Sequence, residues 1–423
     1  MAVAPSSLPN ATQVDGERWE AHRLADLGKC YRGVSYDPDR HLLERPRPDS
    51  IQLLRSNNVQ VASLDLAETQ HVVPSCVAPD QIMRTHDILI CTANGSKELV
   101  GKAAAFAPPD AGPYTFGAFM SCFRPNPAAV SPRFASYLFQ TTEYRRQVAL
   151  ALAGSSINNL RPAQIEDMVF RVPDRARQEV IAGVLDAATA FLGTLGGLAS
   201  KKEAIRQGAT DQLLSGRLRL EGFDGPWLER RLGDVGRWSG GMTPSMANPD
   251  FWDHGTTPWV ASGDVKRHRL TDTALHITDA AIDMTGATIL PRGSVVIVTR
   301  SGILRRYLPV ATLLKPMAVN QDMKAVIPNP DVDSEFLLQA IRANGSQILA
   351  TCLKAGTTVE SIEYSWLKDY ALLLPPLTEQ QAIAAVLHDM DAEIEALEAQ
   401  RSKAALLLQG MIEKLMLATP WLA

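Results

Sequence analysis

The stretch PDRARQEVIAGVL, residues 173–185, returns as PPLTEQQAIAAVL at residues 375–387. The match continues without a gap to about residues 214 and 416, at a constant offset of 202 residues (375 − 173). A second echo lies upstream at an offset of 208 residues (227 − 19), where Trp19, Leu24, Asp26 and Gly28 correspond to Trp227, Leu232, Asp234 and Gly236. The chain is an internal repeat, so we expect it to present two similar surfaces to a ligand that has two parts.

The repeated stretches carry the pattern of coiled-coil helices. In the second copy, broken only by Arg401, apolar residues recur in steps of four and three at Ile383, Leu387, Met390, Ile394, Leu397, Ala404, Leu408, Met411 and Leu415. Thr378 and Gln381 predict a capping box at its start, and Asp174 is the expected N-cap of the first copy. The first copy keeps the seam through Ile181, Leu185, Ala188, Leu192 and Leu195. Its glycines 193, 196, 197 and 208 weaken the helix but would permit close helix approach.

Two such helices in one chain favour an antiparallel intramolecular pair. The alternative is that each helix packs only on its own globular module. The intervening segments predict buried strands at 87–92 and 294–299, each ending at a glycine turn, and helices at 134–150 and 336–349. The predicted class is therefore α+β, with two mixed α/β modules separated by long helices and related by a pseudo-twofold repeat. The expected parts are a flexible arm (1–17), module 1 (18–172), a central helix (173–215), module 2 (216–374, with a linker at 216–226) and a C-terminal helix (375–418).

Composition excludes several classes. The 423 residues are 46% hydrophobic and 21% charged with a net charge of −4, as in an ordinary soluble protein. We find no apolar run near the ~18 residues of a membrane span and no signal peptide. The five scattered cysteines favour a reducing cytoplasm over a disulfide framework or zinc site. The sequence contains no phosphate loop, glycine-rich cofactor loop, methyltransferase Asn-Pro-Pro step, metal-ligand cluster or catalytic triad, which indicates a recognition scaffold without a reaction centre.

Local charge points to a ligand for module 2. Between residues 291 and 324 the only acidic residue is Asp322, whereas the basic residues are Arg292, Arg300, Arg305, Arg306, Lys315 and Lys324. A basic module in a mildly acidic chain suits contact with phosphate, and Arg, Asn and Gln suit base edges. For any single residue here, a solvated surface charge is the simpler interpretation.

In this order, these motifs resemble the specificity subunits of type I restriction-modification systems. The resemblance rests on P-x4-Q-x2-I-x2-V-L at 173–185, Leu213–Arg219, the W-x4-L-G-D-V run at 227–235 and PPL-x-EQ-x2-I at 375–383. It implies that each module reads one half of a split DNA target. It also implies helices that set the spacing and dock two modification (methyltransferase) subunits, which join restriction (motor-nuclease) subunits. S-adenosylmethionine, ATP and Mg²⁺ would belong to those partners. One departure is Ala93, which stands where module 2 has Arg300.

We therefore predict a cytoplasmic, non-catalytic DNA-recognition subunit. The alternatives are an enzyme (a DNA methyltransferase or nuclease with an unrecognised site) and a coiled-coil adaptor that binds protein. The DNA-contacting residues predicted in module 1 are Arg55, Ser56, Asn57, Asn94, Lys97 and Ser155. Those predicted in module 2 are Arg300, Ser301, Arg305, Arg306, Asn320, Gln321 and Thr357.

Overall fold

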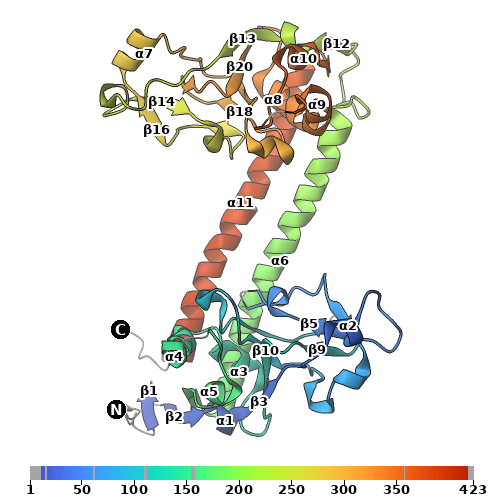
Figure 1. Ribbon diagram of the computed structural model, residues 1–423, viewed down its shortest axis with the longest axis vertical. Coiled ribbons are helices and arrows are strands. Elements are labelled where there is room, and N and C mark those ends of the chain that lie inside the picture. The colour runs from blue at the N-terminus through green and yellow to red at the C-terminus, as the bar shows by residue number, and fades with distance from the viewer. Residues whose placement is uncertain are drawn as a thin grey trace. The chain divides into compact units, whose positions relative to one another are not determined.

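A computed structural model describes residues 11–14, 17–60, 62–108, 112–153, 158–356 and 358–417 (Figure 1). The chain divides into two compact units, Met1–Leu195 with Gln400–Ala423, and Gly196–Ala399. Unit 1 contains module 1 and unit 2 contains module 2, and each also holds part of the long helices α6 (Arg175–Leu213) and α11 (Leu377–Met416). The predicted class of mixed α/β modules with long helices is confirmed.

The described strands of unit 1 form sheets with the orders β1-β2-β11, β3-β10-β7-β8 and β4-β6-β5-β9. Strand β10 lies antiparallel between β3 and β7, and β5 pairs with β9 in parallel. The strands are β1 Ala11–Val14, β2 Glu17–Arg23, β3 Gly28–Arg32, β4 Leu42–Leu43, β5 Ile51–Leu54, β6 Gln70–Val72, β7 Ile88–Cys91, β8 Ala103–Ala105, β9 Tyr114–Phe116, β10 Met120–Pro125 and β11 Val169–Pro173. Part of the arm that we expected to be flexible is thus a strand, because β1 pairs with β2.

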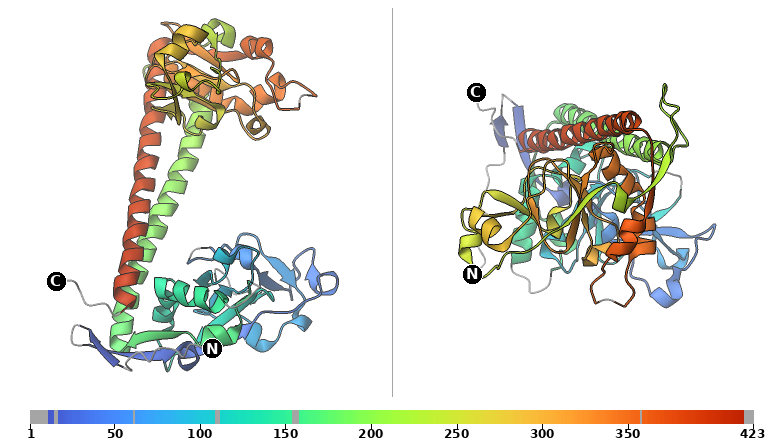
Figure 2. Two further views of the ribbon diagram at one scale, coloured as in Figure 1. Left: turned by 60° about the vertical axis from the view of Figure 1, so that its left-hand side comes forward. Right: turned by 90° about the horizontal axis from the view of Figure 1, so that it is seen from above.

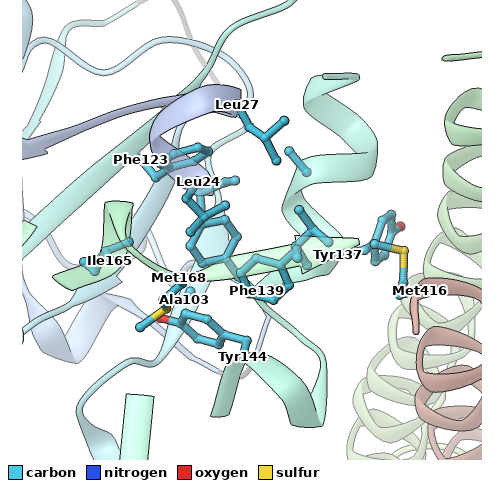
Figure 3. Close-up of a cluster of buried hydrophobic side chains, with 14 of the residues drawn as sticks. Leu24, Leu27, Ala103, Phe123, Tyr137, Phe139, Tyr144, Ile165, Met168 and Met416 are labelled. Carbon is cyan, nitrogen blue, oxygen red and sulfur yellow. The ribbon is translucent and has the colours of Figure 1, made fainter. Parts of the chain in front are cut away.

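Short helices close the core of unit 1. They are α1 Leu24–Leu27, α2 Pro38–His41, α3 Pro132–Leu138, α4 Thr142–Ala153 and α5 Pro162–Glu166. The helix predicted at 134–150 is therefore two helices. The chain breaks between them because Thr141 Oγ1 accepts a hydrogen bond from the Tyr144 N–H (3.1 Å) and restarts the helix. These helices pack on a hydrophobic cluster that includes Phe123, Phe139 and Tyr144. Met416 of α11 belongs to the same cluster and lies beside Tyr137 (Figure 3).

Unit 2 repeats much of this plan. Its described strands form a five-stranded sheet of order β13-β20-β17-β18-β15, a three-stranded sheet β16-β14-β19 and the pair β12-β21. The strands are β12 Leu228–Arg231, β13 Gly236–Gly240, β14 Thr257–Val260, β15 Arg269–Leu270, β16 Leu275–Ile277, β17 Val295–Val298, β18 Val310–Leu313, β19 Ala318–Val319, β20 Met323–Pro328 and β21 Ala371–Leu374. As β10 does with β3 and β7, β20 pairs antiparallel with β13 and β17. Strands β14 and β19 are parallel, like β5 and β9.

The helices of unit 2 are α7 Asp279–Thr285, α8 Ser334–Ala343, α9 Gly345–Cys352 and α10 Tyr364–Asp369. The helix predicted at 336–349 is again two helices, and they meet at Asn344, whose side chain donates to the Ala340 carbonyl (2.9 Å). A polar junction joins α6, α8 and α11. There Gln339 Oε1 accepts from Arg206 and Arg342 (both 3.0 Å), and Arg206 Nε donates to Asp391 (2.8 Å). Burial, then the neighbouring Arg206, lowers the pKa of Arg342 to about 10.

The repeated motif anchors each module to its long helix by a buried glutamine. In unit 1, Gln178 Oε1 accepts from the Ser131 N–H (2.7 Å) and Gln178 Nε2 donates to the Pro173 carbonyl (2.8 Å). In unit 2, Gln380 Oε1 accepts from the Asp333 N–H (2.9 Å) and Gln380 Nε2 donates to the Pro375 carbonyl (2.8 Å). Only a side chain with both a donor and an acceptor can serve this position.

The starts of the long helices differ from each other. Asp174 is confirmed as a cap, since its Oδ1 accepts from the Arg177 N–H (3.0 Å). The capping box predicted at Thr378 and Gln381 is wrong. Helix α11 begins one residue earlier, at Leu377, and the Pro376 carbonyl accepts from the Glu379 and Gln380 N–H groups (2.9 and 3.0 Å).

The predicted apolar seams face inward in both long helices. The seam positions of α11 are buried or half-buried, whereas Glu395, Glu398 and Arg401 are exposed. At three of these four glycines close approach is not used, since a Cβ at Gly193, Gly197 or Gly208 would meet nothing within 4 Å among the described residues. On α6 a second apolar stripe is exposed, formed by Val180, Val184, Phe191, Leu198 and Ile205.

Helix α6 is more apolar than we expected. By length and composition it could cross a membrane, with a window of mean hydropathy 1.5. Core helices of soluble proteins pass the same test, so this property alone is weak support for a membrane span. The high value reflects the Ile, Leu and Ala of its buried seam together with the Val, Phe, Leu and Ile of its exposed stripe.

Candidate nucleic-acid interface

Both modules build the same backbone framework where their central strand ends. In module 2, β17 ends and the N–H groups of Thr299 and Arg300 both donate to the Asp322 carbonyl (2.8 and 3.1 Å). In module 1, β7 ends and the N–H groups of Thr92 and Ala93 both donate to the Phe119 carbonyl (2.9 and 3.2 Å). The turn that precedes β10 or β20 is thereby fixed against the strand end.

Two further segments meet this framework in each module. In module 1 the segment before α5 adds a β-bridge between Ala93 and Asn159. In module 2 the segment before α10 adds one between Arg300 and Ser361. The loop after the parallel strand approaches from the other side. It is reached by a hydrogen bond from the Gly117 N–H to the Leu54 carbonyl, and by one from the Asn320 N–H to the Val260 carbonyl (both 3.0 Å). Loops distant in the sequence therefore converge at one edge of each module.

The structure gathers several of the predicted residues at this edge of module 2. Arg300 is exposed at the strand end, and Gln321 is exposed on the facing turn, where Gln321 Oε1 accepts from the Thr243 hydroxyl. Within the described chain, the guanidiniums of Arg300 and Arg306 have no hydrogen bond or ion pair. Two unpaired, exposed arginines on a rigid edge are available to a phosphate or a guanine edge.

Arg305 is partly engaged by its own module. It lies in the 3₁₀ turn Gly302–Arg305 and pairs with Glu360, and this hydrogen bond lowers the pKa of the Glu360 carboxyl. Ser301 Oγ caps the same turn by accepting from the Ile303 N–H (3.4 Å). Asn320 is buried, and its Oδ1 accepts from the Asp322 N–H (3.1 Å), so this amide shapes the turn.

In module 1 the arginine comes from a different loop. Arg55 N–H donates to Asn58 Oδ1 (2.8 Å) at the turn Ser56–Asn58, and Ala261 N–H donates to Asp264 Oδ2 (2.8 Å) at the turn Ser262–Asp264. Arg55 thus occupies the position of Ala261, while Ala93 occupies that of Arg300. Module 1 therefore has no arginine at the end of β7, but it has the exposed Arg55 on the loop opposite.

Arg55, Ser56 and Asn57 line a cleft of ≈ 670 Å³ together with Ser35, Tyr36, Pro38, Gly117, Ala118, Phe119 and Met120. Of the other predicted residues in module 1, Lys97 is exposed, and Asn94 Oδ1 accepts from the Ser96 N–H (3.0 Å). Predicted residues Ser155 and Thr357 lie outside the described residues.

Sequence reasoning missed Phe119, Tyr36 and Glu360. The turn 117–119 of module 1 corresponds to 320–322 of module 2, at an offset of 203 residues (323 − 120) taken from the starts of β20 and β10. We had selected Asn320 and Gln321 without their counterparts, which the strand alignment would have supplied.

Among the described residues, no group of His, Cys, Asp and Glu side chains could hold a metal ion. The cysteines are free, and burial raises the pKa of the Cys30 thiol to about 12, so it is not an activated nucleophile.

The chain resembles known proteins over its whole length. Residues 225–406 match the family model described as the type I restriction modification DNA specificity domain. The specificity subunit of the Escherichia coli type I restriction enzyme EcoR124I/EcoR124II is 34% identical over 216 residues, which is 51% of this chain and 52% of that one. This chain therefore matches about half the length of that relative. The EcoKI specificity subunit of Escherichia coli K12 is 24% identical across 95% of this chain and 88% of that one.

Solved structures share the fold. A chain from a type I restriction-modification system, solved to explain complex assembly and conformational transition, is 16% identical and covers 96% of this chain and 99% of that one, with a TM-score of 0.59. The specificity subunit of M. genitalium is 12% identical and covers 97% and 99%, with a TM-score of 0.57. The domain match and these relatives show that the chain is similar to the specificity subunits of type I restriction-modification systems.

Proposed function

We propose that this chain is the DNA sequence-specificity subunit of a type I restriction-modification complex and reads a split target, one half per module. The observation that carries the proposal is the repeated framework. Two modules hold the same turn by the same pair of backbone hydrogen bonds, to the Phe119 and Asp322 carbonyls. The exposed side chains on that framework differ, with Arg300 and Gln321 in one and Arg55 and Phe119 in the other. Constant backbone with different side chains is what two readers of different sequences require.

The residues that we propose for DNA contact lie on this edge and beside it. In module 2 they are Arg300, Ser301, Arg305, Arg306 and Gln321, with Asn320 shaping the turn. In module 1 they are Arg55, Ser56, Asn57, Asn94 and Lys97. Ser155 and Thr357, which lie outside the described residues, remain predicted contacts.

We also propose that α6 and α11 pair as an antiparallel coiled coil, in a pseudo-twofold chain with the parts 18–172, 173–215, 216–374 and 375–418. Their contacts in unit 2 support this, because Lys202 pairs with Glu393 (2.7 Å) and Arg206 with Asp391 (2.8 Å), so the residue numbers run in opposite directions. In unit 1, Ile181 and Leu185 share one apolar cluster with Ile412 and Met416. Figure 2 shows the two ribbons side by side in each unit.

Two modification (methyltransferase) subunits are the proposed partners of the helices, with restriction (motor-nuclease) subunits joining them. The exposed stripe of α6, Val180 to Ile205, supports a protein partner, because five large apolar side chains at heptad-like spacing on one helix would gain free energy when a partner buries them. S-adenosylmethionine, ATP and Mg²⁺ would be bound by those subunits in the cytoplasm, and this chain would be non-catalytic.

Module exchange tests the proposal. Residues 18–172 are replaced by those of another specificity subunit, the chain is expressed with its modification subunits, and methylated adenines are mapped in the host genome. We expect one half of the methylated site to change and the other half, read by module 2, to stay. An unchanged site would refute the proposal, as would methyl transfer by the chain alone when supplied with DNA and methyl donor.

A further inference from the structure

Phe119 is a large apolar side chain held out into solvent by a rigid turn. Its side chain is 71% exposed, although burying a phenylalanine is among the larger gains that folding offers. The turn is not loose. The Phe119 carbonyl accepts two hydrogen bonds from the end of β7, and the Met120 N–H donates to the Gly117 carbonyl (2.9 Å). The fold thus fixes the position of an aromatic ring that it does not use in its own core.

The corresponding residue of module 2 has the opposite chemistry. Asp322 occupies the same hydrogen-bonded position, and Ala118 of module 1 corresponds to the exposed amide of Gln321. Module 2 therefore presents polar groups from this turn and an arginine from the strand end. Module 1 presents an aromatic ring from the turn and brings its arginine, Arg55, from the opposite loop.

Phe119 is one of the residues that line the cleft, together with Arg55, Asn57 and Tyr36. This combination of an aromatic wall with a guanidinium and an amide suits the edge of a base pair. In the major groove the thymine 5-methyl group is the apolar feature, and a phenylalanine can pack on it. Arginine and asparagine suit the acceptors and donors of neighbouring bases.

We propose that module 1 recognises a thymine in its half of the target by packing the 5-methyl group against Phe119, with Arg55 contacting an adjacent base or phosphate. The inference rests on the proposed DNA-reading function and adds a residue and a base to it. Because Phe119 is exposed and its backbone carbonyl makes the fixing bonds, a side-chain change at this position leaves the framework in place.

The test removes a single methyl group from the DNA. Once the target has been mapped, duplexes are made in which each thymine of the module 1 half-site is replaced in turn by deoxyuridine. Binding is measured with the complex of this chain and its modification subunits. One such replacement should weaken binding by the wild-type complex about fourfold, the value of one buried methyl group. Phe119→Ala should bind the thymine and deoxyuridine duplexes equally.

Two controls separate the possible failures. Leu150→Ala removes another exposed apolar side chain of module 1, in α4, and should keep the full preference for thymine. Deoxyuridine in the module 2 half-site should show no dependence on residue 119. The inference is overturned if the module 1 half-site holds no thymine, if no replacement weakens wild-type binding, or if Phe119→Ala still prefers thymine. A complex that binds all DNA sequences alike would instead refute the proposed function.

Discussion

Replacing Gln178 by methionine should loosen module 1 from its long helix. Gln178 is 3% exposed, and its amide satisfies the Ser131 N–H and the Pro173 carbonyl. Methionine fills a similar volume, so the change leaves no large cavity. It does leave two buried backbone groups without partners. Each unpaired group costs about 1–3 kcal/mol, so we expect a loss of about 2–6 kcal/mol in the local stability of unit 1.

Native-state hydrogen exchange is the suitable assay, because a chain of two units need not unfold in one step. A loss of about 2 kcal/mol speeds exchange about 30-fold, and this should appear around residues 129–134 and 173–182. The matched variant Gln380→Met should move the effect to residues 331–335 and 375–384, since Gln380 holds Asp333 in the same way. Gln207→Met, at an exposed glutamine bonded to Asp211, is the control and should stay within about 0.5 kcal/mol. Unchanged exchange in Gln178→Met would refute the anchoring argument.

Three more predictions follow from the described contacts. Arg300→Ala should cost about 1–3 kcal/mol of DNA-binding free energy and relax specificity at one base, whereas Arg306→Ala should weaken binding to all sequences alike and lower the salt slope of binding by about 1. Binding to single-substituted duplexes at two salt concentrations checks both. If Arg300→Ala and Arg305→Ala both leave binding unchanged, this edge does not contact DNA. Burial and, next, the charge of Arg342 lower the pKa of His268 below its ordinary value. The unfolded chain therefore binds more protons than the folded chain, and the free energy of unfolding of unit 2 should fall as the pH drops through about 6.5. In urea unfolding, His268→Asn should make this free energy less dependent on pH. Gly208→Ala should stabilise α6 by about 0.5–1 kcal/mol in thermal unfolding, because the added Cβ would meet nothing within 4 Å among the described residues. Gly101→Ala should instead destabilise unit 1, because φ is +80° and the added Cβ would lie 2.9 Å from Val148 Cγ1.

The long helices were predictable because their signal is local and repeated. Heptad spacing at residues such as Ile383 and Leu387 places apolar side chains on one face whatever the rest of the chain does. The strands that end just before Thr92 and Thr299 were also predictable, because short apolar runs rich in β-branched residues and followed by a glycine turn favour a strand over a helix. The breaks at Thr141 and Asn344 were not. They depend on hydrogen bonds of single side chains, which composition over a window of ten or more residues conceals.

The candidate interface was only partly predictable. Arg300 and Gln321 were predicted because basic and amide side chains on loops suit contact with DNA, and both are exposed at this edge. Asn320 had the same chemistry, but it is buried because its backbone continues the pairing of β19 with β14. Phe119 was missed because an aromatic residue in a sequence is normally assigned to the core. Its exposure depends on the pairing of β10 with β7, whose paired ends, Cys91 and Met120, are 29 residues apart in the sequence (120 − 91).

Holding the turn that we propose to contact DNA by its carbonyl oxygen has an evolutionary consequence. The hydrogen bonds that fix residues 119 and 322 involve no side-chain atom of either residue, so a codon change there alters what is presented without altering how it is held. Most substitutions elsewhere in a protein must first be tolerated by the fold before they can be useful. At these positions novelty is nearly free of that constraint. Under the proposed function, successive single substitutions at these positions could change the recognised DNA sequence, with each intermediate protein still folded and the rest of the complex unchanged.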